Sequence, residues 1–240
     1  MELQPFPDDW SSALCIAAHP DDLEYGTAAA VARWTAEGRT VRYLLATRGE
    51  AGIDDLPPAE AGPLREQEER DGARVVGVEE VDFLDFADGT VEHGLPLRRA
   101  IAAGVRRVRP DLVVTSTFAE FFPGGFANQA DHRAVGLAVL DACADAGNRW
   151  IFPELLEEGL PPWTGVRYVA IAAAHAPTHV LDVTDTFEAA VGSLATHERY
   201  LSALGPQYPT PRQLLGEILG GPEGADAPRK TWSAQLVVRR

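Results

Sequence analysis

Three side chains that could bind a metal or move a proton, those of His19, Asp21 and Asp22, stand directly after an apolar segment. Residues 14–18 have the length and composition of a buried strand, and Pro20 favours a turn after it. Because open α/β sheets bind ligands at the carboxyl ends of their strands, we expect these side chains at that edge. A strand followed by a polar turn that caps a helix would have the same sequence pattern. This segment alone therefore does not distinguish a functional site from a structural turn.

A second histidine, His132, follows Asp131 at the start of a predicted helix later in the chain. His19, Asp22 and His132 would make a two-histidine, one-carboxylate set, which is typical of catalytic zinc with a position left for water. Bound zinc would acidify that water and polarise a carbonyl, and Asp21 could take the proton. Taken singly, His132 is more typical of an exposed histidine at a helix start, and Asp131 of an acid that the helix dipole favours.

An alternation of strands and helices has to bring these two segments together. Strands are predicted at residues 14–18, 41–47, 81–84, 111–116, 166–173 and 178–183, and helices at residues 26–37, 64–76, 95–108, 131–144 and 185–204. The alternation predicts a mostly parallel sheet with helices on both faces. Segments 54–63 and 155–164 contain prolines and are predicted to be irregular, whereas 117–129, rich in phenylalanine and glycine, is typical of an active-site loop.

The domain organisation follows from length and from the absence of a repeat or a second boundary. We predict a single domain over residues 1–240, with a core at about residues 13–204. Prolines and glycines are dense after the core, so residues 205–240 are predicted to form an irregular tail with a short helix near residues 213–219.

Composition limits the partners and the location. The net charge of −15 argues against binding to nucleic acid or an anionic membrane, because both favour basic surfaces. No apolar segment approaches the ~20 residues of a membrane span, and the first ten residues do not resemble a signal peptide. Cys15 and Cys143 are predicted to be buried, reduced thiols, and a cytoplasmic location is expected. The sequence leaves open whether the chain forms a homo-oligomer.

Further motifs, in consistent order between about residues 13 and 200, resemble those of the PIG-L/LmbE-like zinc deacetylases. The motifs are Ala18-His19-Pro20-Asp21-Asp22, Thr47-Arg48-Gly49-Glu50-Ala51-Gly52, Arg65 with Glu68, Asp88-Gly89, Asp131-His132, and Thr178-His179-Val180 before Asp182-Val183-Thr184. The resemblance implies a Rossmann-like fold and a hydrolase that removes N-acetyl groups from small molecules containing N-acetylglucosamine. It also implies zinc, or another divalent metal, as cofactor.

By matching position, the resemblance implies that His19, Asp22 and His132 are the metal ligands. Asp21 would be the general base, and Asp131 would help to orient the site.

The resemblance also assigns residues around the substrate. Arg48 would line the catalytic pocket, while Arg65 and Asp88 would contact sugar hydroxyls. His179 is predicted to form part of the pocket wall. His197 has no assigned role and is predicted to lie on a helix surface or at an interface.

The chain departs from the family pattern at Gln129. Many members carry a histidine there, three residues before the second ligand histidine, as a general acid or a stabiliser of the oxyanion. A glutamine amide can donate to an oxyanion but cannot shuttle a proton. We therefore predict a catalytic role for Gln129 and leave the general acid open, either Asp21 acting twice or another group.

Other functions stay open beside an N-deacetylase. The chain could be an amidase acting on a larger or non-sugar amide, or a non-catalytic metal-binding relative. A phosphoacceptor receiver domain, which Asp21, Asp22 and Thr47 would suggest, is about half this length and needs a lysine in its pocket. The sole lysine is Lys230, in the tail, so this alternative is nearly excluded.

Overall fold

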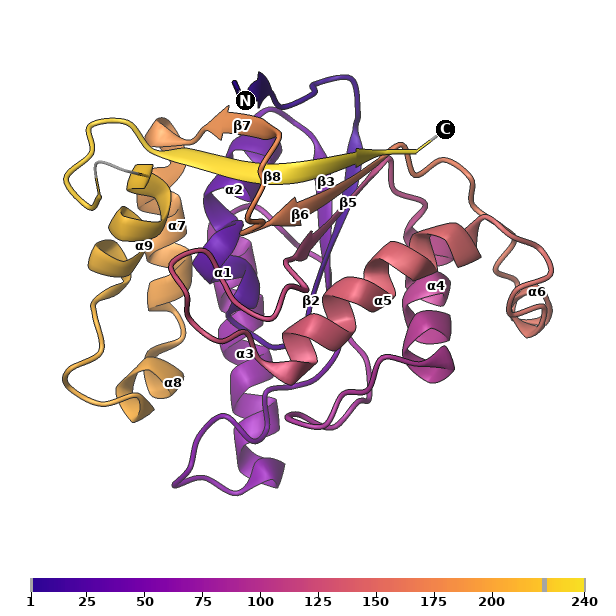
Figure 1. Cartoon of the computed structure of the whole chain (residues 1–240). Coiled ribbons are helices and arrows are strands. Elements are labelled where there is room, and N and C mark those ends of the chain that lie inside the picture. The colour runs from indigo at the N-terminus through magenta and orange to yellow at the C-terminus, as the bar shows by residue number, and fades with distance from the viewer. Residues whose placement is uncertain (1, 222–223, 240) are drawn as a thin grey trace.

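The middle of the molecule is an eight-stranded sheet, formed within residues 2–221 and 224–239, which the computed structural model describes (Figure 1). Its strands are β1 (Gln4–Pro5), β2 (Ser12–Ala17), β3 (Thr40–Leu45), β4 (Val81–Phe83), β5 (Leu112–Ser116), β6 (Tyr168–Ala172), β7 (His179–Asp182) and β8 (Thr231–Val238). They lie in the order β1-β7-β8-β6-β5-β2-β3-β4. β8 runs antiparallel to β6 and β7, and the other neighbouring pairs are parallel.

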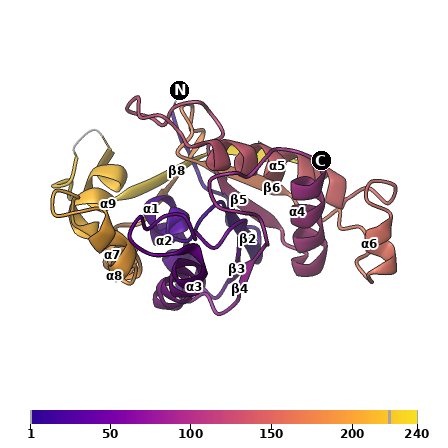
Figure 2. The ribbon, with the colours of Figure 1, turned by 90° about the horizontal axis from the view of Figure 1, so that it is seen from below.

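Helices cover both faces of this sheet, which confirms the predicted α/β class (Figures 1 and 2). They are α1 (Asp22–Gly26), α2 (Ala28–Ala36), α3 (Pro58–Val75), α4 (Leu95–Val108), α5 (Ala130–Ala146), α6 (Glu154–Glu157), α7 (Phe187–Ala195), α8 (Glu198–Ala203), α9 (Pro211–Gly220) and the 3₁₀ turn η1 (Thr184–Thr186). One buried apolar cluster includes side chains of α1, α2, α3, α7 and α9, and a second includes side chains of α4, α5 and α6. Among the described residues, no helix has the length and apolar character needed to span a bilayer.

The strand before the first histidine is apolar from Ala13 to Ala17 because both of its faces are buried there. Ala13, Cys15 and Ala17 of β2 belong to one apolar cluster, while Leu14 and Ile16 belong to the other. Successive side chains of a strand point to opposite faces, so a strand between two helical layers needs apolar residues at every position. This pattern anchors the loop that follows β2.

The order of the strands brings two loops to one place. Counted along the chain, β2 to β6 lie in the order β4-β3-β2-β5-β6, so the direction of winding reverses between β2 and β5. Ligands of such sheets bind at the carboxyl ends of the strands beside this reversal. β2 ends at Ala17 and β5 at Ser116, and the two loops that follow, residues 18–21 and 117–129, carry the predicted site and lead into α1 and α5.

Two segments predicted to be irregular contain helix. Within 54–63, α3 begins at Pro58 and includes Pro63, and the short helix α6 overlaps 155–164. A proline in the first turn costs little, because the N–H that it lacks would have no partner within the helix. Pro63 lies further inside α3, so the helix loses one backbone hydrogen bond there. The prediction of an irregular segment was wrong because the other interactions of α3 outweigh the loss of this bond.

The helix predicted over 185–204 is interrupted. It is divided into η1, α7 and α8, and His197 stands between α7 and α8. The prediction that His197 lies on a surface was wrong, since its side chain is fully buried beside Glu24 and Glu69. The helical pattern of residues 185–204 does not show that other helices cover the side chain of His197.

The tail is irregular only in part. The short helix predicted near 213–219 is confirmed as α9, which begins with a capping box between Thr210 and Gln213. The prediction of an irregular end was wrong for β8, which pairs with both β6 and β7 inside the sheet. Its side chains Trp232 and Ala234 are buried, with the partly exposed Ser233 between them, as expected of a strand with one better-covered face.

Candidate active site

The turn after β2 is closed by Asp22, the first residue of α1. Its Oδ2 accepts hydrogen bonds from the backbone N–H groups of Ala18 (3.0 Å) and His19 (2.9 Å). These bonds hold one carboxylate oxygen on the turn. The other oxygen, Oδ1, faces His132 Nε2 at 3.0 Å.

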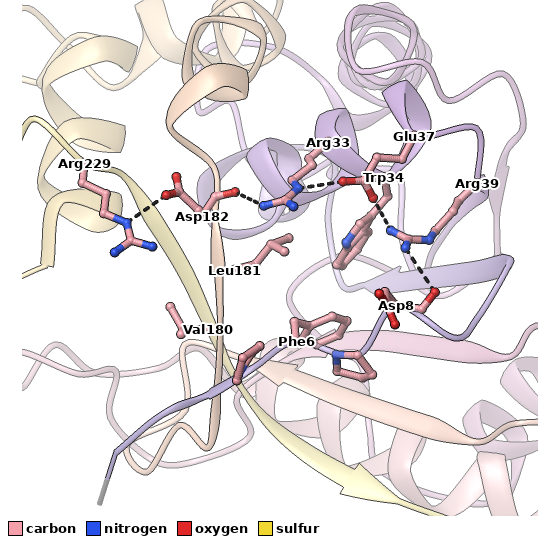
Figure 3. Close-up of a pocket in the computed structure, with 12 residues that line it drawn as sticks. Phe6, Asp8, Arg33, Trp34, Glu37, Arg39, Val180, Leu181, Asp182 and Arg229 are labelled. Carbon is pink, nitrogen blue, oxygen red and sulfur yellow. Dashed lines mark hydrogen bonds and ion pairs between the residues drawn. The ribbon is translucent and has the colours of Figure 1, made fainter.

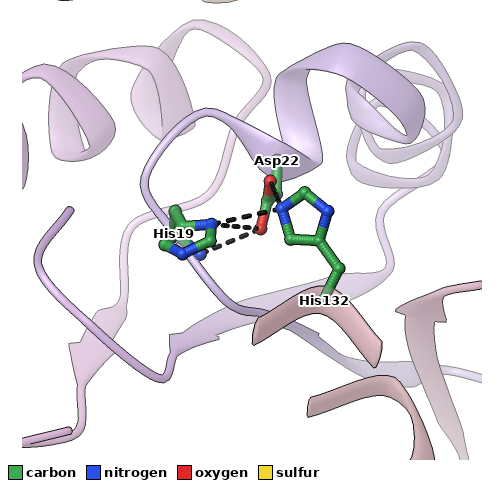
Figure 4. A group of neighbouring side chains, drawn as sticks. All are labelled: His19, Asp22 and His132. Atoms are coloured by element: carbon green, nitrogen blue, oxygen red, sulfur yellow. Dashed lines mark hydrogen bonds and ion pairs between the residues drawn. The ribbon is translucent and has the colours of Figure 1, made fainter. Parts of the chain in front are cut away.

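His132, in the first turn of α5, lies next to His19 and Asp22 at the turn after β2 (Figure 4). Its Nε2 lies 3.2 Å from His19 Nδ1. One atom each from His19, Asp22 and His132 forms a group in which all three lie within 4.8 Å of one another. The structure therefore brings the three predicted metal ligands together.

The tautomer of His132 is determined by Asn128, four residues earlier. Asn128 is buried, and its Nδ2 donates to the carbonyl oxygens of Thr117 (2.9 Å) and Ala119 (2.9 Å). Its Oδ1 must then accept, and it lies 3.0 Å from His132 Nδ1. With the proton on Nδ1, the lone pair of Nε2 points toward His19 and Asp22.

His19 is oriented in the same way by two carboxylates. Its Nε2 lies 3.0 Å from Asp88 Oδ1 and 3.2 Å from Asp131 Oδ2, so this nitrogen donates. Asp131 is fixed in turn by the backbone N–H groups of Gly89 (2.7 Å) and Val91 (3.1 Å). The lone pair of His19 is thus on Nδ1, facing that of His132.

Two imidazole lone pairs facing each other at 3.2 Å repel unless a cation or a proton lies between them. Nitrogen and carboxylate ligands at this spacing fit a divalent transition metal, with zinc the common occupant of such sets. A second group, formed by His19, Asp88 and Asp131, could also hold an ion. Its carboxylates already accept backbone N–H groups and orient the ring, which is the usual arrangement behind a metal-bound histidine.

The surroundings of the two imidazoles are strongly negative. Burial by itself would lower the pKa of His19, but hydrogen bonds to Asp131, Asp22 and Asp88 raise it to about 12. Burial would raise the pKa of Asp22, yet His132 and His19 hold it well below its ordinary value. Carboxylates that stay ionised around these rings favour a positive charge in the centre.

Asp21, the predicted base, stands directly before Asp22 in an unusual backbone conformation. Its φ of 94° is in the left-handed region, and its side chain is buried. Arg65 Nη2 lies 3.1 Å from Asp21 Oδ2. Burial raises the pKa of Asp21 to about 7, against the opposing charge of Arg65, and the neighbouring Asp22 adds to the rise. A carboxyl group with this pKa suits proton transfer at neutral pH.

Two residues predicted to contact the sugar also contact His19 or Asp21. Asp88 bonds to His19 and accepts the N–H of Ala51 at 2.9 Å. Arg65 is buried, pairs with Asp21, and stacks over the ring of Tyr200 at 3.8 Å. The geometry gives both a part in holding the site; contact with a sugar stays a prediction.

Three other predicted residues lie outside this network. Arg48 is half-exposed and pairs with Glu66 and with Asp85 at 2.7 Å. His179 lies in β7, with its ring 6.4 Å from that of Phe6. Gln129 is exposed at the N-terminus of α5, three residues before the predicted ligand His132. The structure does not join these side chains to the histidine pair.

Sequence reasoning missed Asn128 and the buried group of Glu24, Glu69 and His197. The signal for Asn128 was an amide four residues before His132, at the end of a loop already predicted to be functional. No comparable signal pointed to the buried group, because its members come from three separate helical segments of the sequence.

A cavity with a volume of about 570 Å³ lies elsewhere, against β1, β7 and α2 (Figure 3). It is lined by Phe6, Trp34 and several charged side chains, and none of the predicted site residues is among its lining. Its arginines already have partners: Arg33 bonds to Glu37 (2.8 Å), and Arg229 to Asp182 (2.8 Å). We therefore locate the candidate active site at the histidine pair.

Comparisons with known proteins identify the family of this chain. Residues 14–143 match the model of the PIG-L family, described as GlcNAc-PI de-N-acetylase. A diacetylchitobiose deacetylase of Thermococcus kodakarensis is 30% identical over 197 residues, which are 81% of this chain and 72% of that protein. The chain belongs to the PIG-L family. The matched segment includes both histidines of the pair and the turn after β2.

A second relative and a solved structure are also similar to this PIG-L protein. A 1D-myo-inositol 2-acetamido-2-deoxy-alpha-D-glucopyranoside deacetylase of Kineococcus radiotolerans is 31% identical over an alignment of 206 positions that covers 68% of this chain and 52% of that protein. The structure of the N,N'-diacetylchitobiose deacetylase from Pyrococcus horikoshii superposes with a TM-score of 0.82, covering 96% of this chain and 85% of that one. At 22% identity, this second likeness shows a common fold.

Proposed function

We propose that this PIG-L protein is a metal-dependent N-deacetylase that acts on a small molecule containing N-acetylglucosamine, with zinc as the metal. The observation that carries the proposal is that His19 Nδ1 and His132 Nε2 lie 3.2 Å apart beside Asp22, on the loops that follow the carboxyl ends of β2 and β5. The relatives named above are deacetylases of N-acetylated amino sugars, which supports this substrate class. We also propose that residues 1–240 form one domain, since β8 of the tail pairs inside the sheet.

The bound metal would supply a Lewis acid that acidifies water and polarises the amide carbonyl. Asp21 takes a proton from the attacking water while the oxygen of that water forms a bond to the carbonyl carbon. The carbon–nitrogen bond then breaks, acetate forms, and Asp21 returns the proton to the departing nitrogen. Asn128 holds His132 in place, and Asp88 and Asp131 hold His19, so that the centre does not have to reorganise during the reaction.

Metal content and acetate release, measured together, test the proposal. We expect about one divalent metal ion per chain and release of acetate from N-acetylglucosaminides, with N,N'-diacetylchitobiose in the panel. His132→Ala should lose both. His93→Ala is the matched control, because His93 pairs with Asp141 on the surface at 3.0 Å, away from the site. Metal retention by His132→Ala would refute the ligand assignment.

The same panel separates the alternatives. Metal binding without hydrolysis of any amide would indicate a non-catalytic relative. Preference for a longer acyl group or a non-sugar amide would indicate an amidase that uses the same centre.

A further inference from the structure

The backbone of Asp21 holds a conformation that side-chain-bearing residues rarely adopt. Its φ of 94° and ψ of −26° belong to the left-handed region, and it follows directly after Pro20. Such a conformation persists when surrounding contacts impose it, and it often occurs where a side chain must be aimed at a reacting group.

One helix holds both polar groups of the Pro20–Asp21 peptide. Arg65 of α3 donates through Nη2 to the carbonyl oxygen of Pro20. One turn later, Glu69 Oε2 accepts the N–H of Asp21 at 2.9 Å. The Arg65 guanidinium also lies 3.1 Å from Asp21 Oδ2, so α3 fixes the peptide and the side chain together.

Glu69 is itself enclosed. Its side chain is fully buried, and its Oε2 lies 3.8 Å from His197 Nε2, as does Oε2 of Glu24. Glu24 Oε1 accepts from Ser193 Oγ at 3.2 Å. Burial lowers the pKa of His197 to about 3, so this imidazole is neutral. Because no part of the Glu69 side chain is exposed, it cannot touch a substrate, and it can act only through its neighbours.

We propose that Glu69 and Arg65 are positioning residues that hold Asp21 in its left-handed conformation, so that its carboxylate stays aimed at the metal centre. The inference rests on the proposed function, in which Asp21 is the general base. It gives Arg65 a part different from the sugar contact that the family resemblance implied. It also accounts for a buried glutamate whose bond goes to a backbone N–H beside the active site.

The test compares two substitutions at Glu69. Glu69→Met keeps much of the volume but removes the acceptor, so kcat should fall by ~10²-fold, with KM and metal content unchanged. Glu69→Gln keeps an oxygen that can accept from Asp21 and should retain most of the activity. Ser193→Ala is the control for damage to the buried group, because Ser193 bonds to Glu24 and the Gly72 carbonyl rather than to Asp21. It should lower the melting temperature without lowering kcat.

A double variant shows whether the effect passes through Asp21. In the Asp21→Asn background, Glu69→Met should cause little further loss, because the base that it positions is already removed. An undiminished second loss would overturn the proposal, and so would unchanged kcat in Glu69→Met alone.

A crystal structure of Glu69→Met provides a readout that does not depend on activity. We expect Asp21 to leave the left-handed region or its carboxylate to turn away from the histidine pair; an unchanged Asp21 would overturn the inference. If the wild type hydrolyses no amide in the panel, the proposed function fails while this structural comparison still decides whether Glu69 positions Asp21.

Discussion

Asp21 combines a buried carboxylate, an arginine partner and a pKa raised to about 7 by burial. As a base it works only when it is deprotonated, so kcat should fall about tenfold per pH unit below this value and level off above it. Asp21→Asn should keep its metal and lose at least ~10²-fold in kcat, because the amide cannot accept the proton. Measuring kcat against pH in both proteins checks this. If kcat of Asp21→Asn falls at low pH in the same way as kcat of the wild type, another group is responsible for that fall.

The neighbouring Asn128 acts on the metal through His132. Its Oδ1 fixes the ring, since its Nδ2 is committed to two backbone carbonyls. Asn128→Leu removes this bond and should weaken metal affinity by about 10–100-fold. Competition with a fluorescent chelator would measure the affinity; equal affinity in variant and wild type would show that the ring needs no such support.

Gln129 differs from Asn128 although the two are adjacent, because its side chain is exposed. If its amide donates to the oxyanion, Gln129→Ala should lower kcat by ~10²-fold with metal content unchanged. Gln129→His should preserve or raise activity and add pH dependence near neutrality, because imidazole titrates there. Steady-state kinetics of the two variants distinguishes this from a bystander, for which Gln129→Ala would match the wild type.

At the scale of elements, β8 joins the two parts of the sheet by pairing with β6 on one side and β7 on the other. Ala234 of β8 is fully buried, whereas the next residue, Gln235, is exposed. Ala234→Asp places an unpaired charge between sheet and helices and should reduce the free energy of unfolding by ~4 kcal/mol or more. Gln235→Asp is the control and should change it by less than about 0.5 kcal/mol. Equal effects in urea unfolding would contradict the burial of this strand.

At the scale of the whole molecule, the proposed metal would link the turn after β2 with α5, which belong to distant parts of the chain. A ligand that binds only the folded state stabilises it, so removing the metal with a chelator should lower the melting temperature by about 5–10 °C. Restoring zinc should restore the melting temperature. The melting temperature of His132→Ala should not respond to the chelator; a response equal to that of the wild type would place the stabilising metal elsewhere.

Local patterns in the sequence were enough to predict the α/β class and much of the site. Residues 95–108 were predicted as a helix and form α4 with those bounds, because the apolar positions recur at helical spacing. The meeting of His19 with His132 followed from a rule of topology, since the carboxyl ends of neighbouring parallel strands share one edge. Both inferences needed only short segments and the alternation of strands and helices along the chain.

Tertiary structure alone decided what each polar group touches. Ser193 contacts Glu24 across 169 positions of the chain, and β8 enters the sheet between two strands that precede it. Such pairings depend on which surfaces the other helices and strands leave uncovered when they pack. The local propensities of a segment contain no information about those surfaces. The burial of His197 beside Glu69 and the hydrogen bonds from α3 to the Pro20–Asp21 peptide have the same origin. In each case a side chain of one helix contacts a segment that is distant in the sequence. These contacts form only when the sheet and its helices are assembled.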